Sequence, residues 1–223
     1  AACERAGRAA GAGPRLVAVS KTKPLEMLQD AYGAGQRDFG ENYVQELVEK
    51  APRMPADVSW HFIGHLQSNK AKMLVQGVPN LACVETVDTQ KLANRLNTLC
   101  EGRQAGPLGV MVQVNTSGEE SKSGVEPGPD CVAIARHIHG ACPNLRLQGL
   151  MTIGKPDYTS EPENFLCLAR CREEVAKALE LPVSALELSM GMSGDFEQAI
   201  EMGSDNVRVG STIFGARDYG AKK

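Results

Sequence analysis

Leu16-Val17-Ala18-Val19-Ser20-Lys21 is a short apolar run that ends in a lysine, and Pro24 follows closely. A β-branched run bounded by proline predicts a buried strand. A lysine at the carboxyl end of such a strand is unusual, because burial disfavours the ammonium form and leaves an amine that can attack a carbonyl. The alternative, that Lys21 is the first solvated residue after the strand, is favoured when this segment is taken alone, since lysine is mostly exposed.

Strand-like and helix-like patterns alternate along the rest of the chain, which predicts a parallel sheet. The strand-like runs are residues 15–20, 38–42, 60–66, 81–87, 109–116, 145–153, 186–193 and 206–214. The helical patterns are residues 24–35, 42–50, 68–76, 88–101, 129–141, 162–180 and 194–203. Eight strands with helices between them predict an α/β fold, a single-domain (β/α)8 TIM barrel. An open doubly wound sheet is the alternative, but no GxGxxG motif follows the first strand.

Several helix starts carry their own signals. Pro24 is expected in a first turn, Ser68 and Asp88 as N-caps, and Asp195 in a first turn.

Size and composition indicate one domain and argue against several classes of function. A chain of 223 residues, 42% of them hydrophobic, can form one α/β barrel. Its 24 basic and 27 acidic residues give a net charge of −3 without a basic block, so no nucleic-acid partner is expected. No apolar run reaches the roughly 18 residues of a membrane span. We expect residues 1–13 to be an irregular or truncated N-terminus without a secretory signal, and residues 14–223 to be the barrel.

The cysteines indicate a reducing compartment. The seven are scattered, form no CxxC pair and are odd in number. Cys167 and Cys171 share a helix face, but two thiols do not make a zinc site. Free, mostly buried thiols favour a cytoplasmic protein. A targeting segment upstream of residue 1, for an organelle, stays open.

Chemistry in such a barrel collects at the carboxyl ends of the strands. Those ends carry Lys21, Asn42, His65, Asn115, Thr116, Met151, Ser193, Gly210 and Ser211. The set holds one lysine and several neutral hydrogen-bonding groups. It contains no carboxylate pair suited to glycoside hydrolysis and no cluster with the spacing of metal ligands, so no metal is expected.

Two segments near the end of the chain are suited to binding phosphate. Barrels often hold phosphate at the loops after strands seven and eight. The last strand runs into Gly210-Ser211-Thr212, and the strand before it ends at Ser193-Gly194-Asp195, where a helix begins. Glycine lets the backbone approach an anion, and N–H groups and hydroxyls bind its oxygens. The alternative is a pair of ordinary polar turns. With Lys21 on the strand beside them, the segments suit a small phosphorylated aldehyde, which pyridoxal 5′-phosphate (PLP) is.

Six segments resemble the signatures of a known family. They are Leu16–Pro24 (LVAVSKTKP), Phe39–Glu46 (FGENYVQE), Trp60–Gln67 (WHFIGHLQ), Gly149–Ile153 (GLMTI), Leu188–Ser193 (LSMGMS) and Val207–Ser211 (VRVGS) with Phe214-Gly215. The chain resembles the pyridoxal phosphate homeostasis proteins, also called PLP-binding proteins, from about Pro14 to Tyr219. The resemblance implies a barrel of the alanine racemase N-terminal type with PLP held as a Schiff base on Lys21. The N-terminal helix usual in the family is missing or clipped here.

The resemblance also implies the other cofactor-binding residues. Arg208 would face the pyridine nitrogen. Ser193, Gly210 and Ser211 would hold the phosphate, with Thr212 as a neighbour. Asn42 and Met151 would line the ring pocket.

A PLP carrier is favoured over an enzyme, and no catalytic residue is assigned. Arginine is always charged and only donates hydrogen bonds, so Arg208 would keep the ring nitrogen unprotonated. Alanine racemases with such an arginine take a second base, a tyrosine, from an extra C-terminal domain of a partner subunit, and the chain ends soon after its last strand. None of its tyrosines, Tyr32, Tyr43, Tyr158 and Tyr219, is expected to face the ring. A racemase-like PLP enzyme of weak activity and a phosphosugar lyase or isomerase without PLP remain alternatives.

The expected partners are PLP and, as transient clients, PLP-dependent apoenzymes, with the chain a monomer or weak homodimer. Lys23 competes with Lys21 for the aldehyde but lies past the strand, at the rim of the pocket. His61 is expected to be a packing or surface residue, and His65 to lie near the pocket. The loop 119–124 is either solvated or a lid that brings Lys122 near an anionic ligand.

Overall fold

The computed structural model describes residues 2–5, 13–119, 123–154 and 162–216. In this part of the chain eight parallel strands close into a barrel in sequence order. The strands are β1 (Arg15–Val19), β2 (Asp38–Glu41), β3 (Ser59–Phe62), β4 (Leu81–Val87), β5 (Leu108–Gln113), β6 (Leu145–Met151), β7 (Glu187–Ser189) and β8 (Asn206–Val209). The predicted (β/α)8 barrel is therefore confirmed, and β1 pairs with β8 along four residues, from Arg15 opposite Asn206 to Ala18 opposite Val209.

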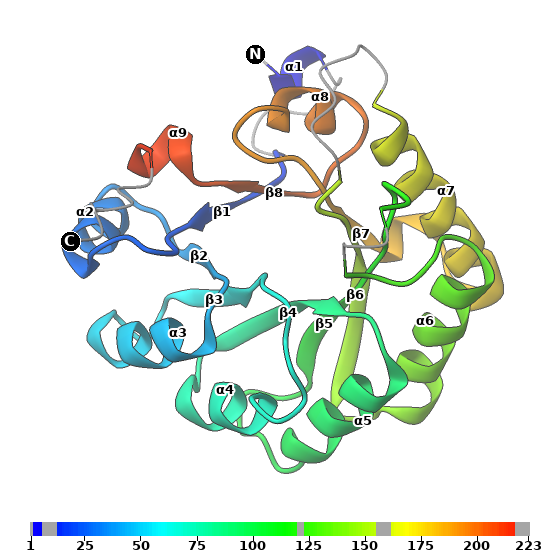
Figure 1. Ribbon diagram of the computed structural model, residues 1–223, viewed down its shortest axis with the longest axis horizontal. Coiled ribbons are helices and arrows are strands. Elements are labelled where there is room, and N and C mark those ends of the chain that lie inside the picture. The colour runs from blue at the N-terminus through cyan, green and yellow to red at the C-terminus, as the bar shows by residue number, and fades with distance from the viewer. Residues whose placement is uncertain (1, 6–12, 120–122, 155–161, 217–223) are drawn as a thin grey trace.

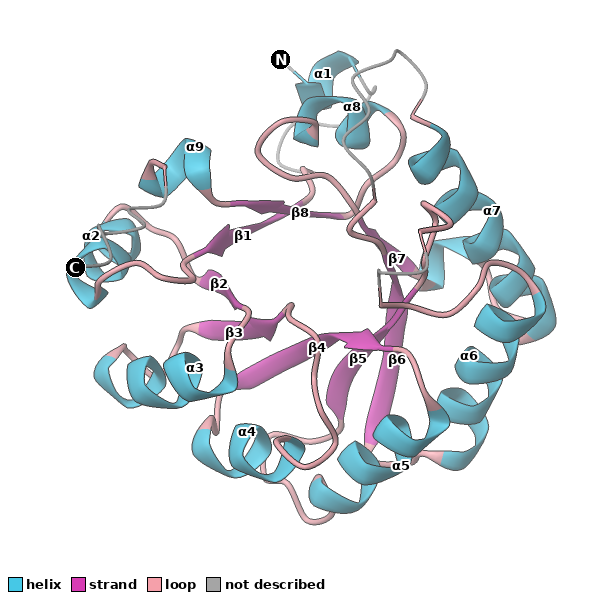
Figure 2. Ribbon diagram, viewed as in Figure 1, coloured by secondary structure: helices cyan, strands magenta, loops and turns pink. Residues whose placement is uncertain are grey.

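Helices surround the ring of strands (Figures 1 and 2). They are α1 (Ala2–Arg5), α2 (Leu25–Gly33), α3 (Val44–Lys50), α4 (Ala71–Gly77), α5 (Gln90–Leu99), α6 (Pro129–Ala141), α7 (Glu163–Ala178), α8 (Phe196–Glu201) and α9 (Ser211–Phe214), with short 3-10 turns at Ala51–Arg53 and Val183–Ala185. Among the described helices, none is both long and apolar enough to cross a membrane.

The strands bury side chains on both of their faces. The main core lies between strands and helices, and includes the fully buried Trp60 and Phe39. Along β4, Val84 belongs to this core, so the alternation of a strand turns Cys83 and Glu85 to the barrel interior. Cys83 packs there in a separate small cluster with Met111 and Met151. The interior therefore contains a carboxylate as well as apolar side chains.

Several strand ends were predicted too long. The run expected as a strand at 206–214 leaves the sheet at Val209, and residues 211–214 form α9 because the N–H groups of Ile213 and Phe214 both bond to the carbonyl of Gly210. The runs 60–66 and 186–193 also leave the sheet early, at Phe62 and Ser189. These segments continue as apolar loops at the mouth of the barrel, which periodicity does not distinguish from strands.

Two predicted N-caps are wrong. Helix α5 is capped by Thr89, whose hydroxyl accepts from the N–H of Leu92 at 3.2 Å. The Asp88 carboxylate lies 3.8 Å from His65 Nδ1 instead. Helix α4 begins at Ala71, after Lys70, and not at Ser68. At the start of the chain, where residues 1–13 were expected to be irregular or truncated, Ala2 and Cys3 of α1 pack against a small cluster formed by Ile200, Val207 and Val209.

Candidate functional site

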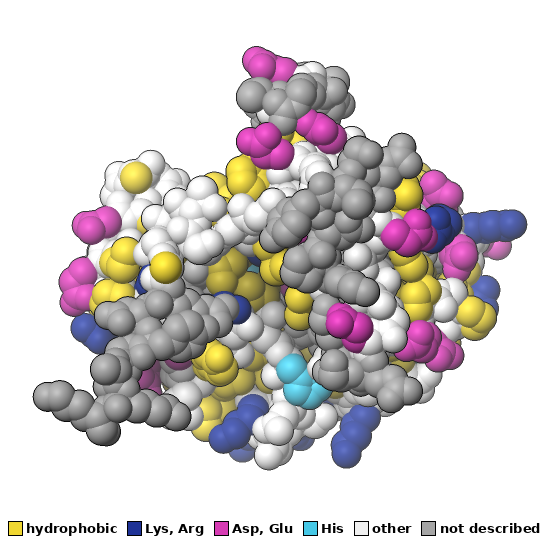
Figure 3. All heavy atoms as spheres, turned by 45° about the horizontal axis from the view of Figure 1, so that its top comes forward, with side chains coloured by type: hydrophobic (Ala, Val, Ile, Leu, Met, Phe, Trp, Pro, Cys, Tyr) yellow, Lys and Arg dark blue, Asp and Glu magenta, His cyan; other side chains and the backbone are white. Residues whose placement is uncertain are grey.

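A cavity of about 330 Å³ opens at the carboxyl ends of the strands, between the loops that follow β1, β7 and β8. One face of the molecule is hollowed near its centre, with hydrophobic side chains inside the hollow (Figure 3). The cavity is lined by Val19, Lys21, Lys23, Asn42, Ile63, Ile153, Met192, Ser193, Gly194, Arg208, Gly210, Ser211 and Gly215. Its size falls in the usual range of small-molecule sites, about 300–1,000 Å³.

Lys21 is held in place through its two neighbours in the chain. The carbonyl of Ser20 accepts from Lys50 Nζ at 2.8 Å, and the N–H of Thr22 donates to Glu46 Oε1 at 2.6 Å. Thr22 adopts a left-handed conformation with φ of 63°, which is costly for a β-branched residue. Helix α3, which carries Glu46 and Lys50, therefore fixes the turn that presents Lys21 to the cavity.

A buried ion pair lies behind this turn. Glu41 is fully buried, and its Oε1 accepts from Lys50 Nζ and from the Ser20 hydroxyl, both at 2.7 Å. Burial raises the pKa of Glu41, and the attraction of Lys50 offsets this only in part. Among the described residues, Glu41 Oε2 has no hydrogen-bond partner. The pair joins β2, α3 and the end of β1.

The wall opposite Lys21 offers donors for an anion. The Ser193 hydroxyl accepts from the N–H of Gly210 at 3.0 Å, so its own hydrogen is available for another acceptor. The N–H groups of Ser211 and Thr212 open the first turn of α9, where a helix supplies no acceptor. Gly210 lies against β1, since a Cβ on it would stand 3.4 Å from Val19.

Arg208 forms the buried end of the cavity and is only 4% exposed. Its Nη1 donates to Ser189 Oγ at 2.5 Å and its Nη2 to the carbonyl of Thr152 at 2.6 Å. The Ser189 hydroxyl donates in turn to Glu85 Oε2 at 2.5 Å. Burial lowers the pKa of Arg208, and the Glu85 charge opposes this effect.

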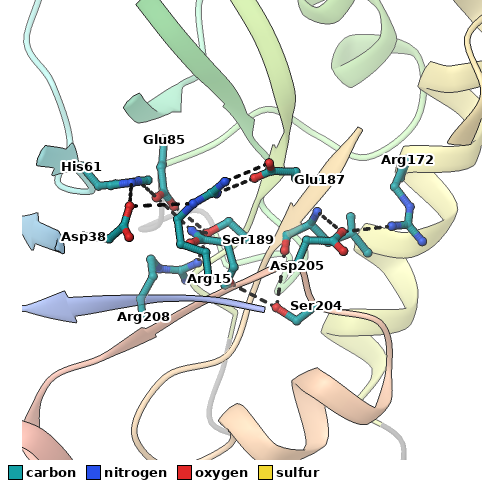
Figure 4. A network of polar contacts seen from close by, with 12 residues as sticks. Arg15, Asp38, His61, Glu85, Arg172, Glu187, Ser189, Ser204, Asp205 and Arg208 are labelled. Atoms are coloured by element: carbon teal, nitrogen blue, oxygen red, sulfur yellow. Dashed lines mark hydrogen bonds and ion pairs between the residues drawn. The ribbon is translucent and has the colours of Figure 1, made fainter. Parts of the chain in front are cut away.

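From Glu85 a chain of charges continues across the barrel interior (Figure 4). His61 lies with Nδ1 2.7 Å from Glu85 Oε1 and Nε2 3.3 Å from Asp38 Oδ1. Burial alone would lower the pKa of His61, but hydrogen bonds to both carboxylates reverse this and raise it to about 9. Asp38 also faces Arg15, which is paired with Glu187 at 2.7 Å. His61 was expected to be a packing or surface residue; it is buried, and it also bridges two carboxylates, which was not predicted.

Six of the eight residues predicted to bind the cofactor line this one cavity. They are Lys21, Asn42, Ser193, Arg208, Gly210 and Ser211. Met151 is fully buried in the interior cluster, and Thr212 is exposed on α9; neither lines the cavity. His65, expected near the pocket, is exposed beside Asp88; it does not line the cavity but borders a neighbouring surface depression that shares Asn42 with it.

Of the other predicted residues, one lies at the cavity and three lie outside the described residues. Lys23 is at the cavity rim, as expected, and its Nζ donates to the carbonyl of Ala216 at 2.7 Å. Lys122, Tyr158 and Tyr219 lie outside the described residues. In the described residues, no group of three His, Cys, Asp or Glu side chains is placed to hold a metal ion.

The residues of the cavity fit a phosphorylated aldehyde. Lys21 is placed for a carbonyl carbon, and Ser193, Gly210 and Ser211 for a phosphate. Asn42 Oδ1 is buried without a hydrogen-bond partner among the described residues, so the cavity also has an unused acceptor.

Comparisons with known proteins identify the family of this chain. Residues 3–218 match the family model described as "Alanine racemase, N-terminal domain". The human pyridoxal phosphate homeostasis protein is 54% identical over 219 residues, covering 94% of this chain and 78% of the human one. The chain belongs to the pyridoxal phosphate homeostasis protein family.

Solved structures of the same fold include a relative with PLP bound and an alanine racemase. The structure of PipY from Synechococcus elongatus, with PLP bound, is 32% identical with a TM-score of 0.76, and covers 96% of this chain and 100% of PipY. Alanine racemase from Clostridium difficile has a TM-score of 0.70 at 12% identity, and the match covers 94% of this chain but 54% of the racemase. At 12% identity, the likeness to alanine racemase shows a shared fold and nothing more.

Proposed function

We propose that this family member binds PLP covalently through Lys21 and serves as an intracellular PLP carrier or buffer in vitamin B6 homeostasis. The observation that carries the proposal is the single cavity in which Lys21 of the β1 turn faces Ser193, Gly210 and Ser211 of the β7 and β8 loops. When bound, PLP supplies an aldehyde for an amine and an electron-withdrawing ring. We propose Lys21 as the tether, Ser193, Gly210 and Ser211 at the phosphate, Arg208 at the ring nitrogen and Asn42 beside the ring. Thr212 and Met151, which do not line the cavity, are proposed as neighbours of the phosphate group and of the ring pocket.

Two features favour a carrier over an enzyme. Arg208 is a permanent cation that only donates hydrogen bonds, so it disfavours a proton on the ring nitrogen, where protonation would strengthen electron withdrawal. The described tyrosines do not line the cavity: Tyr32 donates to Asp57 at 2.7 Å, and Tyr43 borders the neighbouring depression near His65. This placement supports the proposal that the cavity has no second base.

The proposed site of action is the cytoplasm, in agreement with seven cysteines that are all free thiols. PLP-dependent apoenzymes are the proposed clients, and the chain is proposed to act as a monomer or weak homodimer.

The test is an absorbance titration of the purified apoprotein with PLP. We expect a visible band that is fixed by borohydride, is absent from Lys21→Ala and persists in the matched control Lys23→Ala. Peptide mapping of the reduced protein should place the adduct on Lys21. A band that survives in Lys21→Ala would contradict the assignment of the tether.

A second experiment distinguishes a carrier from a racemase: the loaded protein is incubated with single-enantiomer amino acids in deuterium oxide. The α-proton should stay unexchanged over hours. Exchange at about 1 per second or faster, an ordinary enzyme rate, would identify an enzyme instead.

A further inference from the structure

Glu85 is a fully buried carboxylate in the middle of β4. A charged side chain is almost never buried completely unless it is paired. Its partners come from three other strands: His61 from β3, Ser189 from β7 and Asn206 from β8. Glu85 therefore connects opposite sides of the barrel interior.

The hydrogen-bonding capacity of Ser189 fixes the direction of this connection. A hydroxyl has one hydrogen and two lone pairs. Ser189 Oγ accepts from Arg208 Nη1 at 2.5 Å and from Asn206 Nδ2 at 2.9 Å, and both of these groups can only donate. Its single hydrogen is therefore left for Glu85 Oε2, at 2.5 Å. Without an acceptor oxygen at that position, the hydroxyl would have no acceptor and Arg208 would lose its oriented partner.

His61 holds the other oxygen of Glu85. Its two ring nitrogens face two carboxylates, Glu85 and Asp38, so both nitrogens must carry hydrogen and the ring is a cation. Asp38 and Arg15 continue the chain to Glu187 at the amino end of the barrel. Carboxylates and cations thus alternate from Glu187 to Arg208, as Figure 4 shows.

We propose that Glu85 is a positioning residue for Arg208: through the Ser189 hydroxyl it fixes the guanidinium at the buried end of the cavity, and protonated His61 fixes Glu85 in turn. The inference rests on the proposed function, in which the guanidinium of Arg208 faces the PLP ring. The other acceptor of Arg208, the carbonyl of Thr152, belongs to the backbone after β6 and cannot turn with it. Asp195 adds a further negative charge near the guanidinium.

The test compares Glu85→Leu with Glu187→Leu, because leucine, unlike glutamine, leaves no oxygen to accept from the Ser189 hydroxyl. The two substitutions are chemically identical and lie in one chain of contacts, but Glu187 pairs with Arg15 and has no contact with Arg208. Ser189→Ala is the second variant, because it removes only the hydroxyl and keeps the ion pair of Glu85 with His61. PLP affinity and the absorbance maximum of the loaded protein are measured for each. NMR of the apoproteins reports the His61 ring nitrogens and the Arg208 guanidinium protons.

Glu85→Leu and Ser189→Ala should weaken PLP binding by about ten- to a hundredfold, the usual effect of losing a hydrogen bond to a charged group. Both should also shift the absorbance maximum, whereas Glu187→Leu should change neither. In the apoproteins, Glu85→Leu should let His61 lose its proton at a lower pH, and both variants should release the Arg208 guanidinium to rotate. Ser189→Ala should leave His61 protonated.

Restrained guanidinium signals in Glu85→Leu and Ser189→Ala, or PLP binding equal to that of Glu187→Leu, would overturn the role of Glu85. The proposed function fails in a different way. In that case the wild type shows no Lys21-dependent PLP band, while the apoprotein NMR still decides whether Glu85 orients Arg208.

Discussion

Replacing Lys50 by methionine tests whether the buried ion pair behind the Lys21 turn stabilises the barrel. Lys50 is 8% exposed, and its ammonium donates to Glu41, Glu46 and the carbonyl of Ser20 at 2.6–2.8 Å. Methionine keeps most of the volume but leaves the Glu41 carboxylate buried without a cation. Removing one partner of a buried pair costs about 3–5 kcal/mol. For a chain of this size we expect the Tm to fall by about 6–20 °C.

The deficit should depend on pH, because Glu41 can take up a proton in place of its lost partner. Burial already raises the pKa of Glu41 above its ordinary 4.5, and loss of Lys50 raises it further. An acid whose pKa is raised by folding destabilises the protein above its unfolded pKa, and the penalty grows until the folded pKa is reached. The difference from the wild type should therefore be large at about pH 8 and smaller at about pH 5.

Urea unfolding at both pH values measures this difference. Lys72→Met, on the exposed side of α4, is the matched control and should change stability by less than about 0.5 kcal/mol. The double variant Glu41→Gln with Lys50→Met should recover most of the loss, because no charge then stays buried. A deficit equal to that of Lys72→Met, or one that does not shrink on acidification, would refute the reasoning.

Three further predictions concern other parts of the barrel. Gly149→Ala should destabilise by at least about 3 kcal/mol in urea unfolding, because the new Cβ would lie 1.9 Å from the carbonyl oxygen of Glu187; Gly140→Ala, which meets nothing within 4 Å, should be tolerated. Thr22→Gly should raise the free energy of unfolding by up to about 1 kcal/mol, since glycine adopts a φ of 63° without strain. A lower free energy of unfolding in this variant would contradict the idea that Thr22 is strained. The raised pKa of His61 should contribute about 3 kcal/mol that is present below pH 6.5 and lost as the pH rises through about 9; His61→Gln should abolish that dependence in unfolding titrations.

The order of elements was predictable because a (β/α)8 barrel repeats a strong local pattern. Strands β1 and β4 are β-branched runs, and α6 is predicted to the residue, from the proline that begins it to its end at Ala141. The errors fall at the mouth of the barrel, where β7 ends at Ser189 although the apolar pattern continues. Such loops are apolar because they line a cavity, and periodicity carries no information about that.

The polar interior was not predictable in the same way, although one signal was present. Glu85 lies inside an otherwise apolar strand, and a charge at such a position requires a buried partner. The partner cannot be found from the sequence, since His61, Ser189 and Arg208 come from three distant segments that only barrel closure brings together. The sequence alone does predict that Lys21 and Gly210 lie close together, because both lie at the ends of strands that must be neighbours in a closed barrel. Buried carboxylates therefore hold both residues in place. Glu41 acts on the Lys21 turn through Lys50, and Glu85 acts on Arg208 through Ser189. The positions of both carboxylates follow from closure of the sheet.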